Sequence, residues 1–480
     1  MSVAILGAGI TGLATAYLLR REGVPVTVYE AGSAAGGLAA SFEHAGFAFD
    51  YGPHEFCTDN PRLIALLHEV CAEDLLTIEK HTAQHFRGRY VRYPFEIADV
   101  LQNIGLRLSL RAMLEVAACR LRNALRAPKD DSFRAWTEAR FGKTLYDLYF
   151  GPYTEKVWGM DPTLLDPRTA SQRITIDSVW DLLKKTLAFH WLGTEDWKRA
   201  HSEFRKRFFY TRGGIGTLQR RLRDRFLADG GRIEFGRTLA GVERIGNRVT
   251  ALHFADGSTA RGFGQAVSTI PLPTLVRLVH GSAADELLRR EVLPFRGMAF
   301  VFVRVAKPEV LGYHWVYYPD RGVPFQRLTE SAPFRAGMAP EGCTGLTLEV
   351  SCVPGDNTWS RPDAEIAAEC VDTLVRLGHL RPAEVLGWDV VRTTHAYPLQ
   401  VQGFQEKTER LLDSLAVATN LLSIGRQGLF RYCNMNECVE MALAVVPDLV
   451  QGREAIRYTR ANTWQGVALT ERTLAKPRVS

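Results

Sequence analysis

The chain has 480 residues, of which 46% are hydrophobic, and this length exceeds what a single hydrophobic core usually holds. Two domains are therefore expected. The net charge of +6 comes from 59 basic and 53 acidic residues that are intermixed along the sequence, which argues against a dedicated nucleic-acid-binding protein and leaves a mild preference for anionic ligands.

The N-terminal stretch MSVAILGAGITG lacks the basic region and cleavage site of a signal peptide. No uncharged apolar run reaches the roughly 18 residues that a transmembrane helix needs. The eight cysteines form no CxxC pair and are too sparse for a disulfide scaffold. We therefore expect reduced thiols and a cytoplasmic protein, and the sequence leaves monomer and homo-oligomer open.

The first thirty residues predict a strand, a glycine turn, a helix and a second strand. In this context GAGITG is the dinucleotide-binding fingerprint: Gly7 permits the tight turn, Gly9 lets the backbone approach a pyrophosphate, and Gly12 allows close helix packing. Glu30 ends the second strand, where its carboxylate is placed to accept the ribose hydroxyls of an adenosine. An acid at this position disfavours NADP.

A second pair of glycines, Gly36 and Gly37, follows soon after Glu30. This arrangement resembles the extension found in flavoproteins of the amine oxidase and protoporphyrinogen oxidase superfamily. The resemblance implies that the cofactor is FAD, and we expect no metal. No second fingerprint for a nicotinamide nucleotide is visible, so electrons would come from an external reductant or pass to an external acceptor.

Residues 62–80 are predicted to be helical, and FRGRYVRYPF (86–95) is predicted to form a hairpin with its turn at Gly88. The pattern from about 97 to 150 is helical and amphipathic. We interpret this part as helices packed on their own domain with a solvated basic face. A helix at a membrane surface or in a dimer interface is the alternative.

FFYTRGGIGTLQRRLRDRFLADGG predicts a strand, a glycine turn and a helix, followed by short strands with turns at GN and DG. Here the family resemblance implies that the backbone of Val242 contacts the adenine. A mixed strand and helix pattern follows from 285 to 415, and residues 421–443 again predict a strand, a glycine loop and a helix.

These elements predict an α/β fold with a Rossmann-like FAD-binding domain of discontinuous segments and an inserted α+β substrate-binding domain. The FAD-binding domain would comprise residues 1–75, 210–280 and 415–455, and the substrate-binding domain residues 76–209 and 281–414. The polar tail at 456–480 is expected to fray.

Five stretches in the same order resemble UDP-galactopyranose mutase and its relatives, namely YGPHEFCTDN, GKTLYDLYFGPYTEKVWGMDP, VPFQRLTE, AYPL and GRQGLFRYCNM. The resemblance implies that Gly52 and His54 lie against the flavin ring. It also implies cofactor contacts from the late glycine loop and helix start, namely Gly425, Arg426, Met435 and Asn436.

In these mutases reduced FAD attacks the anomeric carbon of the sugar through N5, and the nucleotide diphosphate leaves. The resemblance implies that Arg327 binds that diphosphate, since a guanidinium suits phosphate, and that His54 takes part in the reaction. The further substrate-binding residues that it implies are Tyr153, Trp158, Arg173, Tyr397, Tyr432 and Asn434.

Two positions depart from the mutase pattern. Asp177 stands where the mutases carry a second diphosphate-binding arginine, and Asn434 stands where they carry an aspartate. An acid at position 177 would repel a diphosphate, so we expect a relative that acts on another nucleotide sugar or a glycoside.

The alternative is an oxidase or desaturase of the amine oxidase or protoporphyrinogen oxidase type, in which the flavin accepts a hydride. FYTRGGIGTL and the stretch around residues 425–443 fit those relatives equally well. A non-catalytic FAD-bearing partner protein is a third interpretation.

Overall fold

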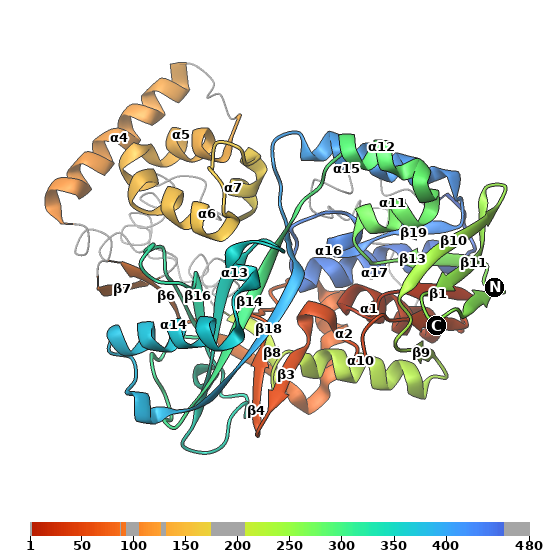
Figure 1. The fold of residues 1–480 in the computed structure, drawn as a ribbon, viewed down its shortest axis with the longest axis horizontal. Helices are drawn as coiled ribbons and strands as arrows, with labels where there is room; N and C mark the ends of the chain where they lie inside the picture. The colour runs from red at the N-terminus through yellow and green to blue at the C-terminus, as the bar shows by residue number, and fades with distance from the viewer. Residues whose placement is uncertain (1, 87, 93–104, 126–130, 174–206, 456–480) are drawn as a thin grey trace.

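The computed structural model of the 480-residue chain describes residues 2–86, 88–92, 105–125, 131–173 and 207–455. It combines helices with one parallel sheet and several antiparallel or mixed sheets (Figure 1), so the predicted α/β class is confirmed. The tail at 456–480 and Asp177 lie outside the described residues.

A five-stranded parallel sheet has the N-terminal strand at its centre. Its strands, in the order in which they pair, are β19 (Leu421–Ser423), β13 (Gln265–Ser268), β1 (Val3–Leu6), β2 (Val26–Tyr29) and β9 (Arg232–Glu234). β1 and β13 are buried at every residue, as is typical of parallel strands covered on both faces. Segments far apart in the chain therefore build one sheet, and the domain boundaries drawn around them remain a prediction.

Four helices pack against one another beside this sheet: α1 (Ile10–Arg21), α2 (Pro61–Cys71), α10 (Gly216–Ala228) and α17 (Met435–Val450). α1 is central among them, because it packs against both α10 and α17. The turn from β1 into α1 lies at the carboxyl end of the central strand. This is where open parallel sheets usually bind their ligands.

An antiparallel three-stranded sheet contains β10 (Leu239–Ile245), β11 (Arg248–Phe254) and β12 (Thr259–Arg261). The chain reverses between them at Gly246 and Gly257, both with positive φ. The turns predicted at GN and DG are thus confirmed.

A seven-stranded sheet forms the second large layer. Its order is β18 (Val385–Pro398), β14 (Phe295–Val305), β17 (Thr344–Cys352), β16 (Arg327–Glu330), β15 (Trp315–Tyr317), β6 (Thr82–Phe86) and β7 (Arg89–Arg92). Every neighbouring pair is antiparallel except β15 with β6. The antiparallel pairing of β6 with β7 confirms the hairpin predicted around Gly88.

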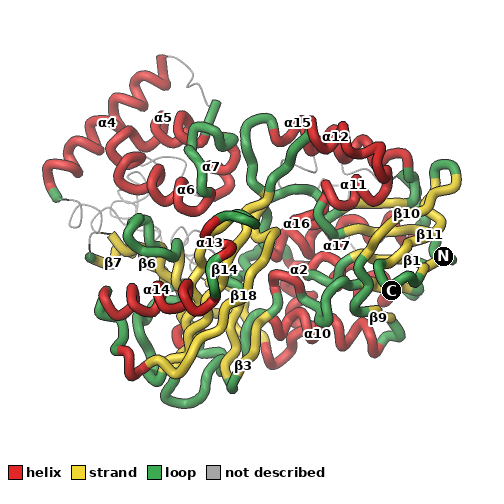
Figure 2. Tube along the Cα trace, viewed as in Figure 1, coloured by secondary structure: helices red, strands yellow, loops and turns green. Residues whose placement is uncertain are grey.

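Helices gather in one region beside this sheet (Figure 2): α4 (Leu106–Leu125), α5 (Phe133–Leu145), α6 (Gly151–Trp158) and α7 (Pro167–Arg173). α4 packs against α5, and α5 against α7. Within the described residues, the helical pattern predicted between 97 and 150 is therefore confirmed.

The prediction of a helix over residues 62–80 is wrong beyond Cys71. Ala72 adopts a positive φ of 45° and ends α2. After a single 3-10 turn at Ala72–Asp74, the chain continues as β5 (Leu75–Glu79). β5 pairs with β8 (Arg207–Thr211), which lies far away in the sequence. The hydrophobic periodicity of a short stretch carries no information about a partner strand elsewhere in the chain. Pairing with that strand overrides the local preference for helix.

The remaining elements are β3 (Ser41–His44) with β4 (Phe47–Asp50), α11 (Leu272–His280), α12 (Ala284–Arg290), α13 (Asn357–Ser360), α14 (Asp363–Arg376), α15 (Phe404–Ser414) and α16 (Gly425–Gly428). None of the helices in the described ranges combines the length and apolar character that crossing a bilayer requires.

Candidate functional site

A cavity of about 990 Å³ opens between the parallel sheet and the seven-stranded sheet. This volume is at the upper end of the roughly 300–1,000 Å³ typical of small-molecule sites. Its walls come from the β1–α1 turn, the loop at 34–40, the segment around His54, strands β15, β16 and β18, and the start of α17. Most sequence-predicted site residues meet here.

The first glycine turn has the geometry that its sequence predicts. Gly7 has a φ of +98°, and a side chain on Gly12 would bring its Cβ within 2.0 Å of the Gly7 carbonyl oxygen. A Cβ on Gly9 would instead meet nothing within 4 Å. Gly12 is therefore needed for packing and does not line the cavity, whereas Gly9 leaves open space at the N-terminus of α1.

Glu30 lines the cavity and already accepts two backbone hydrogen bonds, from the amide of Ala8 at 2.7 Å and from the amide of Gly32 at 2.8 Å. Gly36 and Gly37 both have positive φ, and the Gly36 amide donates to the Ala8 carbonyl at 2.8 Å. The second glycine loop thus folds against the first, and both face the same space.

His54 lies in the wall with its Nδ1 atom buried, and this atom has no partner in hydrogen-bond geometry among the described residues. Burial, followed by the positive charges of Arg426 and Arg327, lowers the pKa of His54 to about 3, with only a small opposing effect of the Gly52 backbone. The imidazole is therefore neutral near pH 7. The buried Nδ1 atom is thus a polar group whose hydrogen-bonding capacity the described part of the chain does not satisfy.

Gly52 explains why the chain before His54 is so constrained. Its φ is +87°, and a Cβ there would lie 2.7 Å from Oε1 of Glu349. Gly52 itself does not line the cavity. It is small because an ion pair lies directly behind it.

That ion pair changes the expectation for Arg327. Its Nε and Nη2 donate to the two carboxylate oxygens of Glu349 at 2.6 and 2.7 Å, and Nη2 also contacts the hydroxyl of Tyr397 at 3.2 Å. The side chain of Glu349 is 1% exposed and that of Arg327 is 13% exposed. The mutase resemblance implied that Arg327 binds a diphosphate, and the structure shows that this guanidinium is already paired with a carboxylate, because a buried carboxylate requires a partner.

Arg426 is the cavity cation with no carboxylate partner in the described residues. It donates to the carbonyls of Cys433 and Ala396 at 3.2 and 2.9 Å. Its guanidinium carbon lies 4.9 Å from the ring centre of Tyr397 and 5.1 Å from that of Tyr432. Within the described ranges, the site therefore has one positive charge that no carboxylate neutralises.

An aromatic group holds these side chains in place. Trp158 is 1% exposed and stands edge-on to Tyr397 and Tyr432, with ring centres 5.8 and 6.4 Å away. Trp158 supports the wall from behind, so its predicted place in the sugar pocket is not seen. Tyr153 does line the cavity, edge-on to Tyr317.

The start of α17 contributes Asn434 and Met435 to the cavity wall. Asn434 caps the helix together with Glu437, as in a capping box. Among the other predicted contacts, Asn436, Gly425 and Val242 do not line this cavity, and Arg173 ends α7 with its side chain outside the described part of the chain. Gly425 packs on Thr11, where an added Cβ would meet the hydroxyl oxygen at 2.8 Å.

Sequence reasoning missed a second charged pair in the wall. Lys80 binds Glu55 at 2.7 Å, and its ammonium lies 5.0 Å from the ring centre of Trp315. The aromatic run HWVYYP alternates along β15 and could have indicated that Trp315 and Tyr317 share one face. No local signal joins Lys80 to them.

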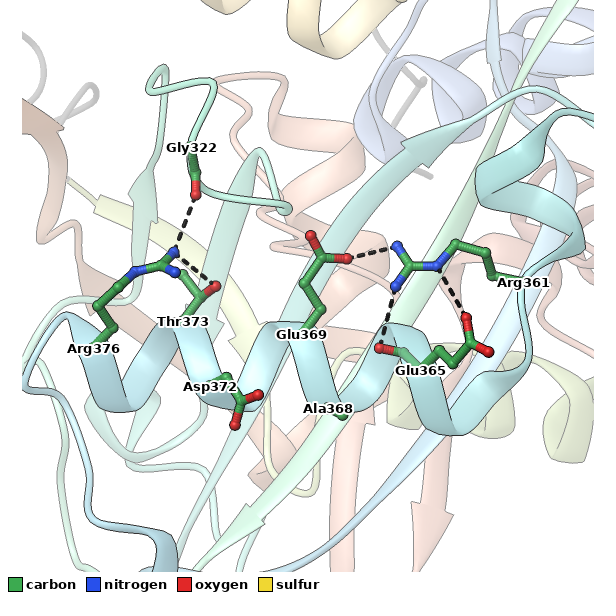
Figure 3. A pocket seen from close by; sticks show the side chains of 8 residues that line it. All are labelled: Gly322, Arg361, Glu365, Ala368, Glu369, Asp372, Thr373 and Arg376. Carbon is green, nitrogen blue, oxygen red and sulfur yellow. Dashed lines mark hydrogen bonds and ion pairs between the residues drawn. The ribbon is translucent and has the colours of Figure 1, made fainter.

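A second cavity of about 450 Å³ lies along α14 (Figure 3). Arg361 pairs with Glu369 and Glu365, and Arg376 donates to the Gly322 carbonyl and to Thr373. Because these arginines already bind neighbouring groups of the protein at an exposed surface, we do not regard this groove as the functional site.

Comparison with known proteins identifies solved structures of the same fold. Solved structures with the same fold include reduced UDP-galactopyranose mutase, with a TM-score of 0.79 and 19% identity over 96% of this chain and 95% of that chain. A redesigned putrescine oxidase gives a TM-score of 0.63 and 15% identity over 94% of this chain and 98% of that one. At these identities the likeness concerns the fold.

Sequence relatives match over shorter stretches. The chain is 40% identical to 1-hydroxycarotenoid 3,4-desaturase of Flavobacterium sp. (strain P99-3) over 85 residues, and 25% identical to mitochondrial protoporphyrinogen oxidase of Nicotiana tabacum over 191 residues. These matches span 17% and 36% of the length of those relatives. The family model of flavin-containing amine oxidoreductases matches residues 10–418, and the chain therefore belongs to that family.

Proposed function

We propose that the protein is an FAD-dependent enzyme that acts on a nucleotide sugar or a related glycoside, in a mutase-like reaction with reduced flavin. The observation that carries this proposal is the convergence on one cavity of the two glycine loops, the neutral His54, three arginines and a wall rich in tyrosine. The lining tyrosines are Tyr51, Tyr149, Tyr153, Tyr317, Tyr397 and Tyr432.

The residues present fit FAD. Gly9 leaves room where a pyrophosphate would meet the N-terminus of α1, and free N–H groups at a helix N-terminus favour an anion. Glu30 lines the same cavity, and the buried Nδ1 of His54 has no hydrogen-bond partner among the residues that the structure describes. A long, partly anionic ligand would satisfy both ends of the cavity.

Bound reduced flavin would supply a nucleophile or an electron pair. The protein would determine which charged groups surround the flavin. Arg426 is unneutralised, and the first turn of α17 presents free amides beside it. Both features stabilise negative charge in a partly dry site. The neutral His54 can donate or accept a hydrogen bond without adding charge.

The substrate would be held mainly by tyrosine hydroxyls. Arg327 uses Nε and Nη2 on Glu349 and Tyr397, while Nη1 has no partner among the described residues. One free N–H edge on a neutralised pair binds phosphate more weakly than a bare arginine would. Six hydroxyl-bearing rings suit a polyhydroxylated ligand better than a long hydrocarbon, which offers no hydrogen-bonding groups.

The second candidate function is an FAD-dependent oxidase or desaturase. It is supported by the partial matches to a carotenoid desaturase and a protoporphyrinogen oxidase. The same cavity would then bind a reduced substrate, and an external acceptor would remove its electrons.

Two assays separate the two functions. In the first, purified protein is reduced with dithionite without oxygen and titrated with a panel of nucleotide sugars, while flavin absorbance and the sugar ring size are followed. The mutase-like proposal expects isomerised sugar with no net flavin oxidation. In the second, oxidised protein receives oxygen and an amine, a porphyrinogen or a polyene; oxygen-dependent turnover there, with no isomerised sugar in the first assay, would refute the proposal.

A further inference from the structure

Two thiols lie side by side in the wall of the cofactor cavity. The Sγ atoms of Cys433 and Cys438 are 3.6 Å apart, and both residues line the cavity although they are only 1% and 4% exposed. From the sequence, both were expected to be reduced thiols. Their contact is a property of the folded chain that the proposed reaction does not use.

The two sulfur atoms lie close enough for a disulfide to form after a small movement. Cys433 precedes the capping residue Asn434, and Cys438 lies in the first turn of α17. A disulfide has an S–S bond of about 2.05 Å, so the present 3.6 Å separation has to shorten by only about 1.5 Å. Small side-chain rotations at a helix start can supply this movement.

Cys438 has the surroundings of a reactive thiol. Hydrogen bonds from Cys433 and the Thr11 hydroxyl, together with the nearby charge of Arg426, lower the pKa of Cys438. The same contact and burial raise the pKa of Cys433. A helix N-terminus also favours a thiolate.

Other cysteines differ from this pair. Burial raises the pKa of five other thiols, those of Cys57, Cys71, Cys119, Cys352 and Cys370. Cys57 is the informative comparison, because it lines the same cavity without a neighbouring thiol, and its pKa is raised to about 12.

We propose that Cys433 and Cys438 form a redox-active dithiol that closes reversibly to a disulfide, with a small hydroperoxide as the oxidant. The Cys438 thiolate attacks one peroxide oxygen, the O–O bond breaks, and the leaving hydroxide takes a proton to become water. Cys433 then attacks the sulfenic acid on Cys438, forms the S–S bond and releases a second water. Two thiols and one hydrogen peroxide thus give one disulfide and two waters, and an external dithiol reverses the change.

A hydroperoxide suits the burial of this pair. Hydrogen peroxide is about the size of two waters and can enter a cavity beside a bound ligand. A bulky disulfide would need a wider opening than two residues that are only 1% and 4% exposed can offer.

The test uses the purified, cofactor-bound enzyme and hydrogen peroxide. After treatment, free thiols are alkylated and the protein is digested with trypsin without reduction. Cleavage after Arg431 and Arg453 gives one peptide, 432–453, that contains both cysteines. We expect this peptide to be lighter by two hydrogens and unalkylated, and dithiothreitol to restore two alkylatable thiols. The Cys57 peptide serves as the internal control and should remain alkylatable.

Two variants identify the attacking sulfur. In Cys433→Ser the sulfenic acid on Cys438 has no partner and should be trapped by dimedone. In Cys438→Ser oxidation of Cys433 should be at least about tenfold slower. The peroxide concentration is raised until Cys57 of the wild type becomes oxidised. If the 432–453 peptide then still carries two alkylated thiols, the proposal is overturned.

Discussion

The ion pair between Arg327 and Glu349 makes the sharpest prediction about this site. Glu349→Gln keeps the side-chain shape but removes the charge that neutralises Arg327. Breaking a buried ion pair costs about 3–5 kcal/mol, because one charge stays buried and unpaired. The amide oxygen of glutamine can still accept one of the two hydrogen bonds, at 2.6 and 2.7 Å in the wild type. We therefore expect the lower end, a loss of about 3 kcal/mol in the free energy of unfolding.

The same substitution should have the opposite effect on ligand binding. With Glu349 neutral, Arg327 attracts an anion with its full charge, and its Nη1 edge is free to bind one. We expect a nucleoside diphosphate such as uridine diphosphate to bind at least about fivefold more tightly, which corresponds to roughly 1 kcal/mol. The variant would thus be less stable and a better anion binder.

Urea unfolding at saturating cofactor measures the first effect, and calorimetric titration with uridine diphosphate measures the second. Glu291→Gln is the matched control: Glu291 binds Arg410 through both oxygens at 2.7 and 2.8 Å, but Arg410 is 51% exposed and the pair does not line the cavity. That variant should lose about 1 kcal/mol or less and bind the ligand as the wild type does. Weaker or unchanged diphosphate binding by folded Glu349→Gln would refute the assignment of Arg327 to the anion site.

Three further predictions concern other parts of the molecule. Gly9→Ala should fold normally but retain less cofactor, because its added Cβ enters the open space proposed for the pyrophosphate, whereas Gly12→Ala should fail to fold stably because its Cβ would meet a carbonyl oxygen at 2.0 Å. Flavin absorbance measures cofactor retention, and thermal unfolding measures stability. Burial raises the pKa of Asp50 to about 6, so folding favours the protonated carboxyl, and this contribution to stability is fully present below about pH 4 and lost as the pH rises to 6. The difference in unfolding free energy between wild type and Asp50→Asn should therefore change only between about pH 4 and pH 6, and a difference that stays constant would contradict this assignment. Arg426→Met should lower the two-electron potential of the bound flavin by about 30 mV for each 1.4 kcal/mol of lost charge stabilisation, and an unchanged potential in spectroelectrochemical titration would remove Arg426 from the flavin's surroundings.

Much of the fold was readable from the sequence because its signals are local. The turn at Gly7, Gly9 and Gly12 combines a positive φ, an open approach and a close packing contact within six residues, and each requirement selects glycine for its own steric reason. The strand, loop and helix at 421–443 follow from periodicity and capping residues in the same way. Such patterns need no knowledge of distant parts of the chain.

Only the tertiary structure decided how the site is charged. Arg327 and Glu349 face each other because β16 pairs with β17 in one register, and no local feature of PFQRLTE reveals that partner. The pairing of β5 with β8 and the place of Trp158 behind the wall likewise depend on packing between distant segments. A local sequence can state which side chain a position carries, whereas the net charge, the burial and the protonation of that side chain depend on whatever the fold brings beside it.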